Sequence, residues 1–286
     1  MCGIVGYIGD KEVIQILMDG LSRLEYRGYD SAGAAVISDG KVSIRKEVGK
    51  LKVLKESLKA KPIPGTLGIG HTRWATHGEP SQINSHPHTD CKGNIILVHN
   101  GIIENYQVLK NMLIEEGHTF KSQTDTEVVA HLIEKHYKGN LEEAVRLALK
   151  EVEGAYALGI LCRNEPDKLV AARCGSPLIV GLGKGENYIA SDVPAILSYT
   201  RDVLYPDDYE IIVITRNSVK VTDLDGKNIE KKRTRIEWDA SAAEKGGYPH
   251  FMLKEINEQP RVIKETLMGR ISKEKDNVIL EDMKIT

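Results

Sequence analysis

The sequence predicts an α+β domain in which helices pack on β-sheets. Short apolar runs rich in β-branched residues recur along the second half of the chain, and amphipathic helical segments are scattered among such runs throughout. The runs that predict strands are Ala155–Cys162, Leu169–Arg173, Leu178–Leu182, Tyr188–Ala190, Glu210–Thr215 and Val219–Asp223. Strands and helices mixed in this way favour a layered domain with a core between sheet and helix.

The first half begins with a helix and a hairpin. Val13, Leu17 and Leu21 recur at helical spacing, so residues 12 to about 26 are predicted to form an amphipathic helix. The dipeptide Asp39-Gly40 separates the apolar runs 34–37 and 42–44 and is a strong hairpin signal.

Two further β-rich segments and three helices complete the first half. Strands are expected over 66–74 and 94–98. A helix is predicted over 105–116, ending at Gly117. Thr124 and Glu127 fit a capping box that opens a helix to about Tyr137, and 141–152 reads as another helix. From Lys231 onward the chain is polar and charged, with a helical stretch at about 251–267 that Pro260 interrupts.

Composition excludes several classes of protein. Hydrophobic residues make up 41% and charged residues 28% of 286 residues, and the formal net charge is -2, so neither nucleic acid nor an anionic membrane surface is indicated as a partner. No run is apolar enough to span a bilayer and no signal peptide is visible, so a cytoplasmic location is expected. Among the cysteines, Cys91, Cys162 and Cys174 are interpreted as structural thiols.

Cys2 is the residue that most strongly indicates chemistry. If Met1 is removed, Cys2 carries a thiol and a free α-amine, and such an amine titrates near pH ~7.7–8.0. An N-terminal amine is a recognised base for activating a nucleophile. By itself, the position of Cys2 favours a small buried thiol in a first strand formed by the apolar residues that follow it, and the other motifs reverse that preference.

Polar clusters at predicted strand ends add candidate functional residues. The segment from His71 to Gly78 leads into a long polar loop, 75–92. Just before this loop, the planar guanidinium of Arg73 could bind a carboxylate through two hydrogen bonds, and the ring of Trp74 could exclude water. Asn100 and Gly101 supply an amide and a backbone N–H suited to an oxyanion, although Asn-Gly is also a common turn dipeptide.

Two more motifs have both a structural and a functional interpretation. Asp125 fits an ordinary first helical turn, or a partner for an ammonium group. The glycines between 181 and 185 lack a P-loop ending and predict a turn. The histidines at 71, 77, 86 and 88 lack the spacing of known metal motifs, so no metal and no cofactor are expected.

Taken in order, these motifs resemble the class II glutamine amidotransferases of the N-terminal nucleophile hydrolase superfamily. Within that class the chain is most similar to the glutaminase domain of the glutamine–fructose-6-phosphate aminotransferase family, in which Tyr-Arg-Gly-Tyr-Asp distinguishes it from sister families. The matching segments are 1–6, 26–33, 71–80, 98–105, 124–127, 175–178, 190–192, 254–256 with 258–260, and 269–272.

The resemblance implies a role for each matching residue. Cys2 is implied as the nucleophile, and Asn100 with Gly101 as the oxyanion hole. The glutamine pocket is implied to comprise Arg73 on the α-carboxylate, Asp125 on the α-ammonium, and Thr76 and His77. Trp74 is implied as a gate for ammonia, and Arg27 as support for the nucleophile.

The implied fold is a four-layer αββα sandwich, and the implied reaction hydrolyses L-glutamine through a γ-glutamyl thioester. In the family the ammonia aminates fructose 6-phosphate in carboxyl-terminal sugar isomerase domains, and the whole enzyme is expected to be a homodimer. We expect residues 1–240 to form the glutaminase domain and 241–286 the linker toward isomerase domains that this chain lacks. The alternatives are a non-catalytic glutamine-binding module and the glutaminase half of another class II amidotransferase.

Overall fold

The computed structural model describes residues 2–27, 30–75, 78–237, 248, 251–267, 271–272 and 277–278. The chain divides into two compact units, Met1–Glu237 and Trp238–Thr286. The predicted linker over 241–286 falls in the second unit, and its role stays a prediction.

The first unit is built on two antiparallel sheets. In spatial order, the strands of the eight-stranded sheet are β14 (Thr234–Arg235), β11 (Asp202–Leu204), β9 (Ile179–Leu182), β10 (Asn187–Ala190), β1 (Gly3–Ile8), β4 (Leu67–Arg73), β2 (Ser31–Ser38) and β3 (Lys41–Val48). Those of the six-stranded sheet are β13 (Val219–Thr222), β12 (Glu210–Ile214), β8 (Leu169–Cys174), β7 (Gly154–Cys162), β6 (Ile95–Ile103) and β5 (His88–Thr89). Strand β1 is central and pairs with β10 on one side and β4 on the other.

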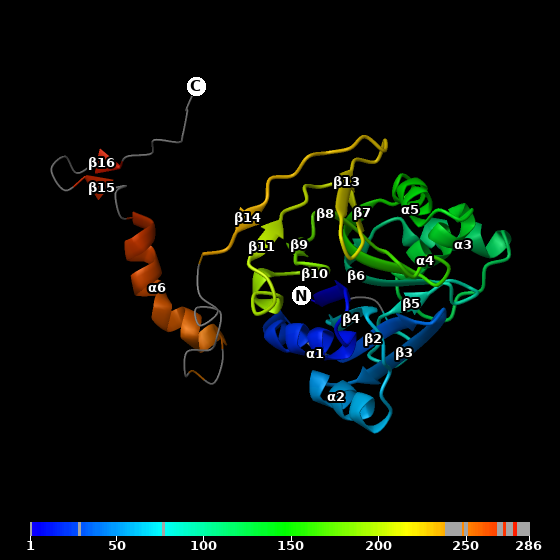
Figure 1. Ribbon diagram of the computed structural model, residues 1–286, viewed down its shortest axis with the longest axis horizontal. Coiled ribbons are helices and arrows are strands. Elements are labelled where there is room, and N and C mark those ends of the chain that lie inside the picture. The colour runs from blue at the N-terminus through cyan, green and yellow to red at the C-terminus, as the bar shows by residue number, and fades with distance from the viewer. Residues whose placement is uncertain are drawn as a thin grey trace. The chain divides into compact units, whose positions relative to one another are not determined.

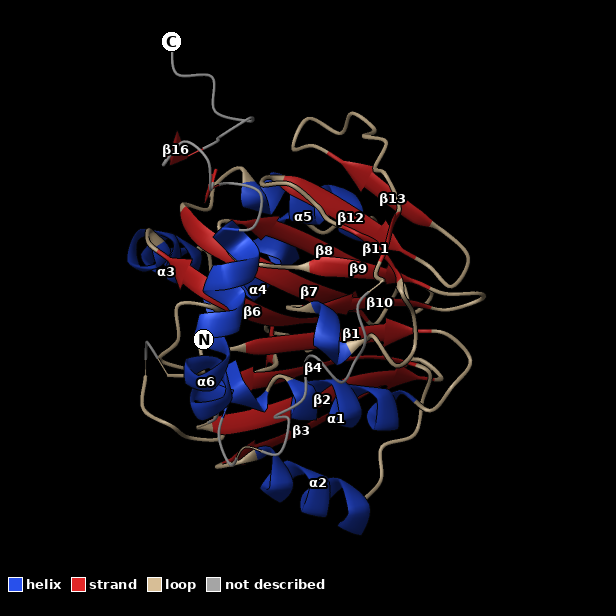
Figure 2. Ribbon diagram, turned by 90° about the vertical axis from the view of Figure 1, so that its left-hand side faces the viewer, coloured by secondary structure: helices blue, strands red, loops and turns tan. Residues whose placement is uncertain are grey.

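Helices cover the outer faces of both sheets (Figures 1 and 2). Helices α1 (Val13–Arg23) and α2 (Leu51–Ala60) lie on the eight-stranded sheet, and α3 (Tyr106–Glu115), α4 (Glu127–His136) and α5 (Leu141–Leu149) on the six-stranded sheet. Single 3₁₀ turns are η1 (Glu25–Arg27) and η2 (Val193–Ala195). The predicted four-layer αββα arrangement is therefore confirmed.

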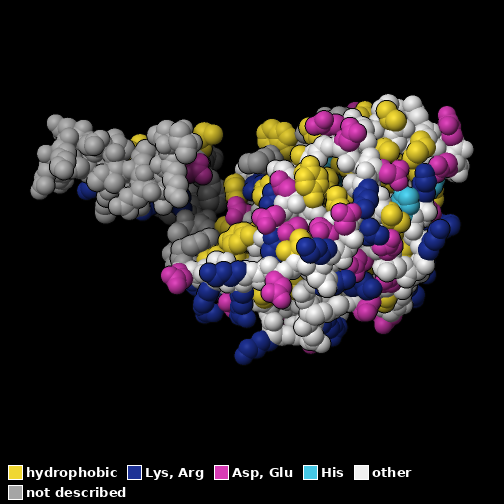
Figure 3. Space-filling model, turned by 90° about the horizontal axis from the view of Figure 1, so that it is seen from above, with side chains coloured by type: hydrophobic (Ala, Val, Ile, Leu, Met, Phe, Trp, Pro, Cys, Tyr) yellow, Lys and Arg dark blue, Asp and Glu magenta, His cyan; other side chains and the backbone are white. Residues whose placement is uncertain are grey.

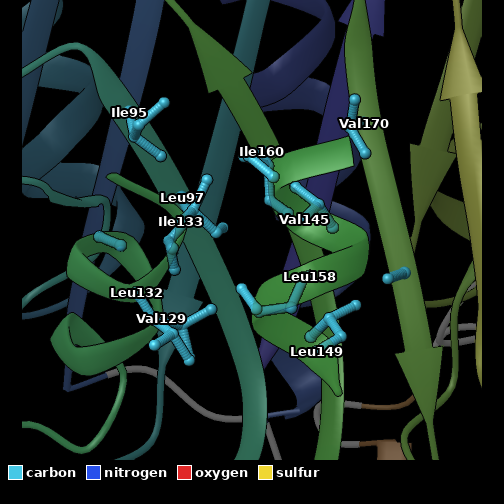
Figure 4. Packing of buried hydrophobic residues seen from close by; sticks show 14 of the residues in the cluster. Ile95, Leu97, Val129, Leu132, Ile133, Val145, Leu149, Leu158, Ile160 and Val170 are labelled. Carbon is cyan, nitrogen blue, oxygen red and sulfur yellow. The ribbon is translucent and has the colours of Figure 1, made fainter. Parts of the chain in front are cut away.

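Strand alternation explains why there are two cores. Successive side chains of a strand point to opposite faces. In β6, Ile96 and Val98 face the other sheet, where they join Ile4 of β1 and Ile69 of β4 in the core between the sheets. Ile95 and Leu97 of the same strand face the helices instead, and pack with side chains of α4 and α5, as Figure 4 shows.

Most of the predicted elements are present. The Asp39-Gly40 hairpin is confirmed, with both residues at positive φ (49° and 69°) between β2 and β3. Helix α3 and its C-cap Glu116 are followed by Gly117 at φ 93°, the glycine at which the sequence predicted the helix to end. Strands β11 and β14 were not predicted, because three and two residues are too short to show alternation.

Two local predictions for the first unit are wrong. His99, Asn100 and Gly101 do not end a strand, because β6 continues to Ile103 and pairs with β7 through all of them. The capping box is also absent, since the N-cap of α4 is Thr126 and the Glu127 carboxylate instead accepts from the backbone N–H groups of residues 121 and 122, at 2.9 and 2.6 Å.

The second unit contains helix α6 (Phe251–Leu267) and the paired strands β15 (Ile271–Ser272) and β16 (Asn277–Val278). The helix continues through Pro260, where the sequence predicted an interruption. None of the described helices is long and apolar enough to cross a bilayer. Positive and negative side chains are interspersed on the face seen in Figure 3, in keeping with the small net charge.

Candidate active site

A cavity of about 290 Å³ opens where β1 begins and β4 and β6 run past it. Its walls are formed by Cys2, Arg27, Arg73, Trp74, His86, His99, Asn100, Gly101, Ile102, Thr124, Asp125, Thr126, Ser176 and Pro177. The structure thus brings together Cys2, Arg27, Arg73, Trp74, Asn100, Gly101 and Asp125, which lie far apart in the sequence. Thr76 and His77, also predicted for the pocket, lie outside the described residues.

The thiol of Cys2 lies at the start of β1, beside the end of β4. The Trp74 backbone N–H donates to Cys2 Sγ at 3.1 Å, and Sγ lies 3.6 Å from the Trp74 carbonyl oxygen. Burial raises the pKa of the Cys2 thiol above its ordinary value, and the Trp74 N–H opposes this only in part. The thiol is therefore neutral at pH 7 and needs a base before it can attack.

Asn100 is held in one amide orientation. His71 Nε2 lies 2.9 Å from Asn100 Oδ1 and 3.0 Å from the His99 carbonyl oxygen. Both are acceptors, so Nε2 carries the hydrogen and Oδ1 must face it. The Asn100 amide nitrogen then points the other way and donates to the Cys2 carbonyl oxygen at 3.2 Å and to Ser191 Oγ at 2.9 Å.

Gly101 has no substitute at its position. Its φ is 134°, which side chains rarely adopt, and a Cβ built there would lie 1.9 Å from the carbonyl oxygen of Ala155 on β7. The glycine therefore lets β6 stay paired with β7 while its backbone lines the cavity.

Arg73 supplies the positive charge of the cavity. It is 3% exposed, and its guanidinium donates to the carbonyl oxygens of Gly78 at 2.9 Å and Glu79 at 3.4 Å. Asp30 lies 3.9 Å from it and also accepts from the Ala75 backbone N–H. Arg73 thus holds the start of the polar loop as well as facing the cavity.

Asp125 supplies a negative charge in the same cavity. It is 4% exposed and precedes α4, and its Oδ2 accepts from the Ile103 backbone N–H at 2.8 Å. That bond anchors the carboxylate to the end of β6, while the residue borders the cavity. A buried carboxylate of this kind is suited to an ammonium group.

Arg27 and Trp74 flank the thiol differently. Arg27 Nε donates to the Cys2 carbonyl oxygen at 3.0 Å, and its NH1 lies 3.8 Å from Asp192, so it fixes the backbone that carries the thiol. The side chain of Trp74 is 58% exposed at the mouth of the cavity.

A cluster of buried neutral histidines backs the cavity. Burial lowers the pKa of His71 to about 3, and it lowers the pKa values of His86 and His99 as well. The rings of His71 and His86 stack at 4.1 Å, and His86 Nδ1 accepts from the His99 backbone N–H at 3.2 Å. These rings serve as hydrogen-bonding supports rather than as charged groups.

Sequence reasoning missed the supporting roles of Ser191 and His71. Ser191 Oγ accepts from the Ile4 N–H at 2.8 Å and from Asn100, which ties β1 to β6. A polar pair directly after a short apolar strand, Ser191-Asp192, was the available signal. Ser191 reaches Ile4 and Asn100 only because β10, which it follows, pairs with β1, and no local sequence pattern reveals that pairing.

Comparison with known proteins places the chain in a family. A family model described as a glutamine amidotransferase domain matches residues 71–198. The glutamine–fructose-6-phosphate aminotransferase of Caldanaerobacter subterraneus subsp. tengcongensis is 58% identical over 286 residues, which is 100% of this chain and 47% of that protein. The same enzyme of Clostridium perfringens is 56% identical with the same coverage. This chain is a class II glutamine amidotransferase domain.

Solved structures agree with that assignment. The glutamine phosphoribosylpyrophosphate amidotransferase of B. subtilis, solved with ADP and GMP, superposes with a TM-score of 0.69 at 27% identity, over 78% of this chain and 49% of that one. The N-terminal nucleophile hydrolase fold predicted by resemblance is thereby confirmed. The amidotransferase domain spans about half the length of the curated relatives it matches.

Proposed function

We propose that this amidotransferase domain hydrolyses L-glutamine to glutamate and ammonia, with Cys2 as the nucleophile once Met1 has been removed. The observation that carries the proposal is the composition of one cavity wall. A thiol, a buried cation (Arg73), a buried anion (Asp125) and an oriented amide donor (Asn100) border the same space. A zwitterionic amino acid with a side-chain amide needs each of these groups.

The base in this proposal is the α-amine of Cys2. Because burial raises the thiol pKa, something must take its proton. In the described part of the chain, the polar partners recorded for Cys2 Sγ are the backbone groups of Trp74, and no side-chain base contacts it. A free α-amine titrates near pH ~7.7–8.0 and would lie on the same residue.

Asn100 is proposed as an oxyanion donor that exchanges partners on substrate binding. The Asn100 amide nitrogen donates two hydrogen bonds, and the one to the Cys2 carbonyl oxygen is the longer, at 3.2 Å against 2.9 Å to Ser191 Oγ. It is therefore the bond proposed to be given up. The Cys2 carbonyl oxygen keeps Arg27 Nε as a donor when that bond is given up. The Gly101 backbone is the proposed second donor.

The reaction then balances in two steps. The sulfur of Cys2 attacks the glutamine side-chain carbonyl carbon, a C–S bond forms, and the C–N bond breaks as the amine passes the thiol proton to the leaving ammonia. Water, deprotonated by the same amine, cleaves the γ-glutamyl thioester to give glutamate and restores the thiol. Arg73 and Asp125 hold the α-carboxylate and α-ammonium throughout.

We further propose that the whole protein is a glucosamine-6-phosphate synthase, because the relatives named above are glutamine–fructose-6-phosphate aminotransferases. Its ammonia would pass to fructose 6-phosphate in sugar isomerase domains joined through residues 241–286, in a cytoplasmic homodimer. This chain alone should release ammonia from glutamine and form no glucosamine 6-phosphate. Sugar phosphate formed by the chain alone would refute that division of labour.

The test is labelling with 6-diazo-5-oxo-norleucine, a glutamine mimic that traps nucleophiles, followed by peptide mass mapping and an assay of glutamate release. We expect a single adduct on a peptide that begins at Cys2, and none on chains that keep Met1. Cys2→Ala should abolish labelling and turnover while glutamine binding survives. Cys174→Ser, a substitution at a buried thiol outside the cavity, is the matched control and should label normally. An unlabelled, folded chain that begins at Cys2 would overturn the proposal.

A further inference from the structure

A second group of chemically reactive side chains lies outside the cavity wall, on α4 and two segments beside it. Its members are Cys91, His118, His131 and Glu134, and one donor atom from each lies within 4.8 Å of all the others. Cys91 follows β5, His118 follows α3, and the other two are three residues apart on α4, which places them on one helix face. Three separate segments therefore converge at this point.

The distances between the donor atoms fit a tetrahedral ion. His118 Nδ1 lies 3.2 Å from both His131 Nδ1 and Glu134 Oε2, and His131 Nδ1 lies 3.6 Å from Oε2. Cys91 Sγ lies 3.7 Å from His118 Nδ1 and 3.4 Å from His131 Nδ1. Zinc bond lengths at tetrahedral angles require edges of about 3.3–3.6 Å between nitrogen, oxygen and sulfur ligands.

The surroundings hold these groups in place. The Cys91 backbone N–H donates to Glu134 Oε2 at 3.1 Å, and the Thr119 N–H donates to Cys91 Sγ at 3.4 Å. The side chains of His118, His131 and Glu134 are 13%, 1% and 14% exposed. These three side chains are therefore largely shielded from water, whereas Cys91 is half-buried.

The second ring nitrogen of His131 supports the same interpretation. His131 Nε2 is buried without a hydrogen-bond partner, and its nearest carboxylate oxygen, Glu127 Oε1, lies 3.6 Å away. Metal-bound histidines commonly direct the free ring N–H toward a carboxylate. Coordination through Nδ1 would place the hydrogen on Nε2, on the side of Glu127.

We propose that Cys91, His118, His131 and Glu134 form a binding site for a zinc ion. Thiolate and imidazole donors favour zinc over magnesium or calcium. Four protein ligands leave no open position, so the ion has a structural role and clamps the segments after β5 and α3 onto α4. This site differs from the histidines at 71, 77, 86 and 88, for which the sequence predicted no metal, and it does not depend on the proposed glutaminase activity.

The experiment uses the full chain, stripped with a chelator and titrated with Zn²⁺ and, in parallel, with Co²⁺. We expect a single ion per chain by elemental analysis, a higher Tm with Zn²⁺, and a Co²⁺ spectrum with a thiolate charge-transfer band and strong tetrahedral bands. Cys91→Ser should remove the charge-transfer band, and His118→Gln should weaken Zn²⁺ binding at least tenfold.

Matched controls keep the test specific. Cys174→Ser removes another buried thiol, and His136→Gln removes another histidine of α4, one that pairs with Glu151. Both should bind metal like the parent chain. A folded parent chain that takes up no Zn²⁺, a Co²⁺ spectrum without thiolate charge transfer, or equal binding by Cys91→Ser would overturn the proposal. The spectrum of the parent chain decides the matter even if a variant fails to fold.

Discussion

Replacement of Asn100 by Ala should slow glutamine hydrolysis without weakening glutamine binding. The amide nitrogen of Asn100 is an oriented donor to the carbonyl oxygen of Cys2, the proposed nucleophile, and His71 sets that orientation through Oδ1. Alanine removes the donor, while the Cys2 carbonyl oxygen keeps its 3.0 Å bond from Arg27. The backbone that carries the thiol should therefore stay in position.

The expected magnitude follows from the loss of one oxyanion donor, about 2.7–4 kcal/mol of transition-state stabilisation or roughly 10²–10³ in kcat. The KM for glutamine should change little, because the α-carboxylate and α-ammonium groups bind elsewhere in the cavity. Ser191→Ala is the control, since it removes the other partner of the Asn100 amide and leaves the donor. Ser191 Oγ accepts two hydrogen bonds, from Asn100 and from the Ile4 N–H. At about 1 kcal/mol each, this control should lose no more than about 30-fold in kcat, which is less than the loss for Asn100→Ala.

The assay measures glutamate release over a range of glutamine concentrations on chains shown by mass to begin at Cys2. Circular dichroism and Tm confirm that each variant folds. A fall in kcat of less than tenfold for Asn100→Ala, or an effect confined to KM, would refute the role of Asn100 as an oxyanion donor. An equal loss for Ser191→Ala would show that the bond network, rather than the donor, carries the effect.

Three further predictions concern substrate binding, the backbone and pH. Asp125→Asn keeps the acceptor for the β6 backbone N–H and removes the charge. A charged hydrogen bond contributes about 1.5–3 kcal/mol, so we expect KM for glutamine to rise by about 10- to 100-fold. An unchanged KM in steady-state assays would contradict this. Gly101→Ala forces a Cβ to within 1.9 Å of a β7 carbonyl oxygen, so we expect about 3 kcal/mol or more of lost stability, and a parent-like urea midpoint would count against it. Burial lowers the pKa values of His71 and His88 to about 3, so the folded state binds fewer protons than the unfolded state between pH 3 and 6.5. The contribution of each neutral ring to the free energy of unfolding is complete above pH 6.5 and falls by about 2 kcal/mol at pH 5. Urea unfolding above pH 6.5 and at pH 5 should therefore show a smaller loss of unfolding free energy for His71→Asn than for the parent chain.

Local elements could be predicted wherever one short pattern decides the structure. The Asp39-Gly40 turn and the helical spacing from Val13 to Leu21 depend only on nearby residues, and both elements are present. Asn100-Gly101 has the strongest turn signal of its region, yet it lies within a strand. Pairing with β7 overrides the local preference, because a glycine at φ 134° can remain in the ladder where another residue cannot.

The site required information that no local pattern contains. Arg73 and Asn100 lie on β4 and β6, and Cys2 directly precedes β1. Their proximity depends on the order of strands in one sheet and on the stacking of the other sheet against it. Only the likeness of several motifs in order to one family predicted that they meet. The Cys91 group had no such support, because its spacings match no metal motif and only the packing of the segments after β5 and α3 against α4 brings its members together.

The central place of β1 has a consequence for dynamics. The ends of a chain usually fray, and loosely held nucleophiles must be ordered by the substrate at an entropic cost. Here the strand that follows Cys2 is bonded along both edges, to β10 and β4, and its side chains are buried on both faces. Its amide hydrogens should exchange with solvent only when the whole unit unfolds. The proposed nucleophile therefore directly precedes one of the most persistent elements of the molecule, and a substrate would meet an attacking group that is already in place.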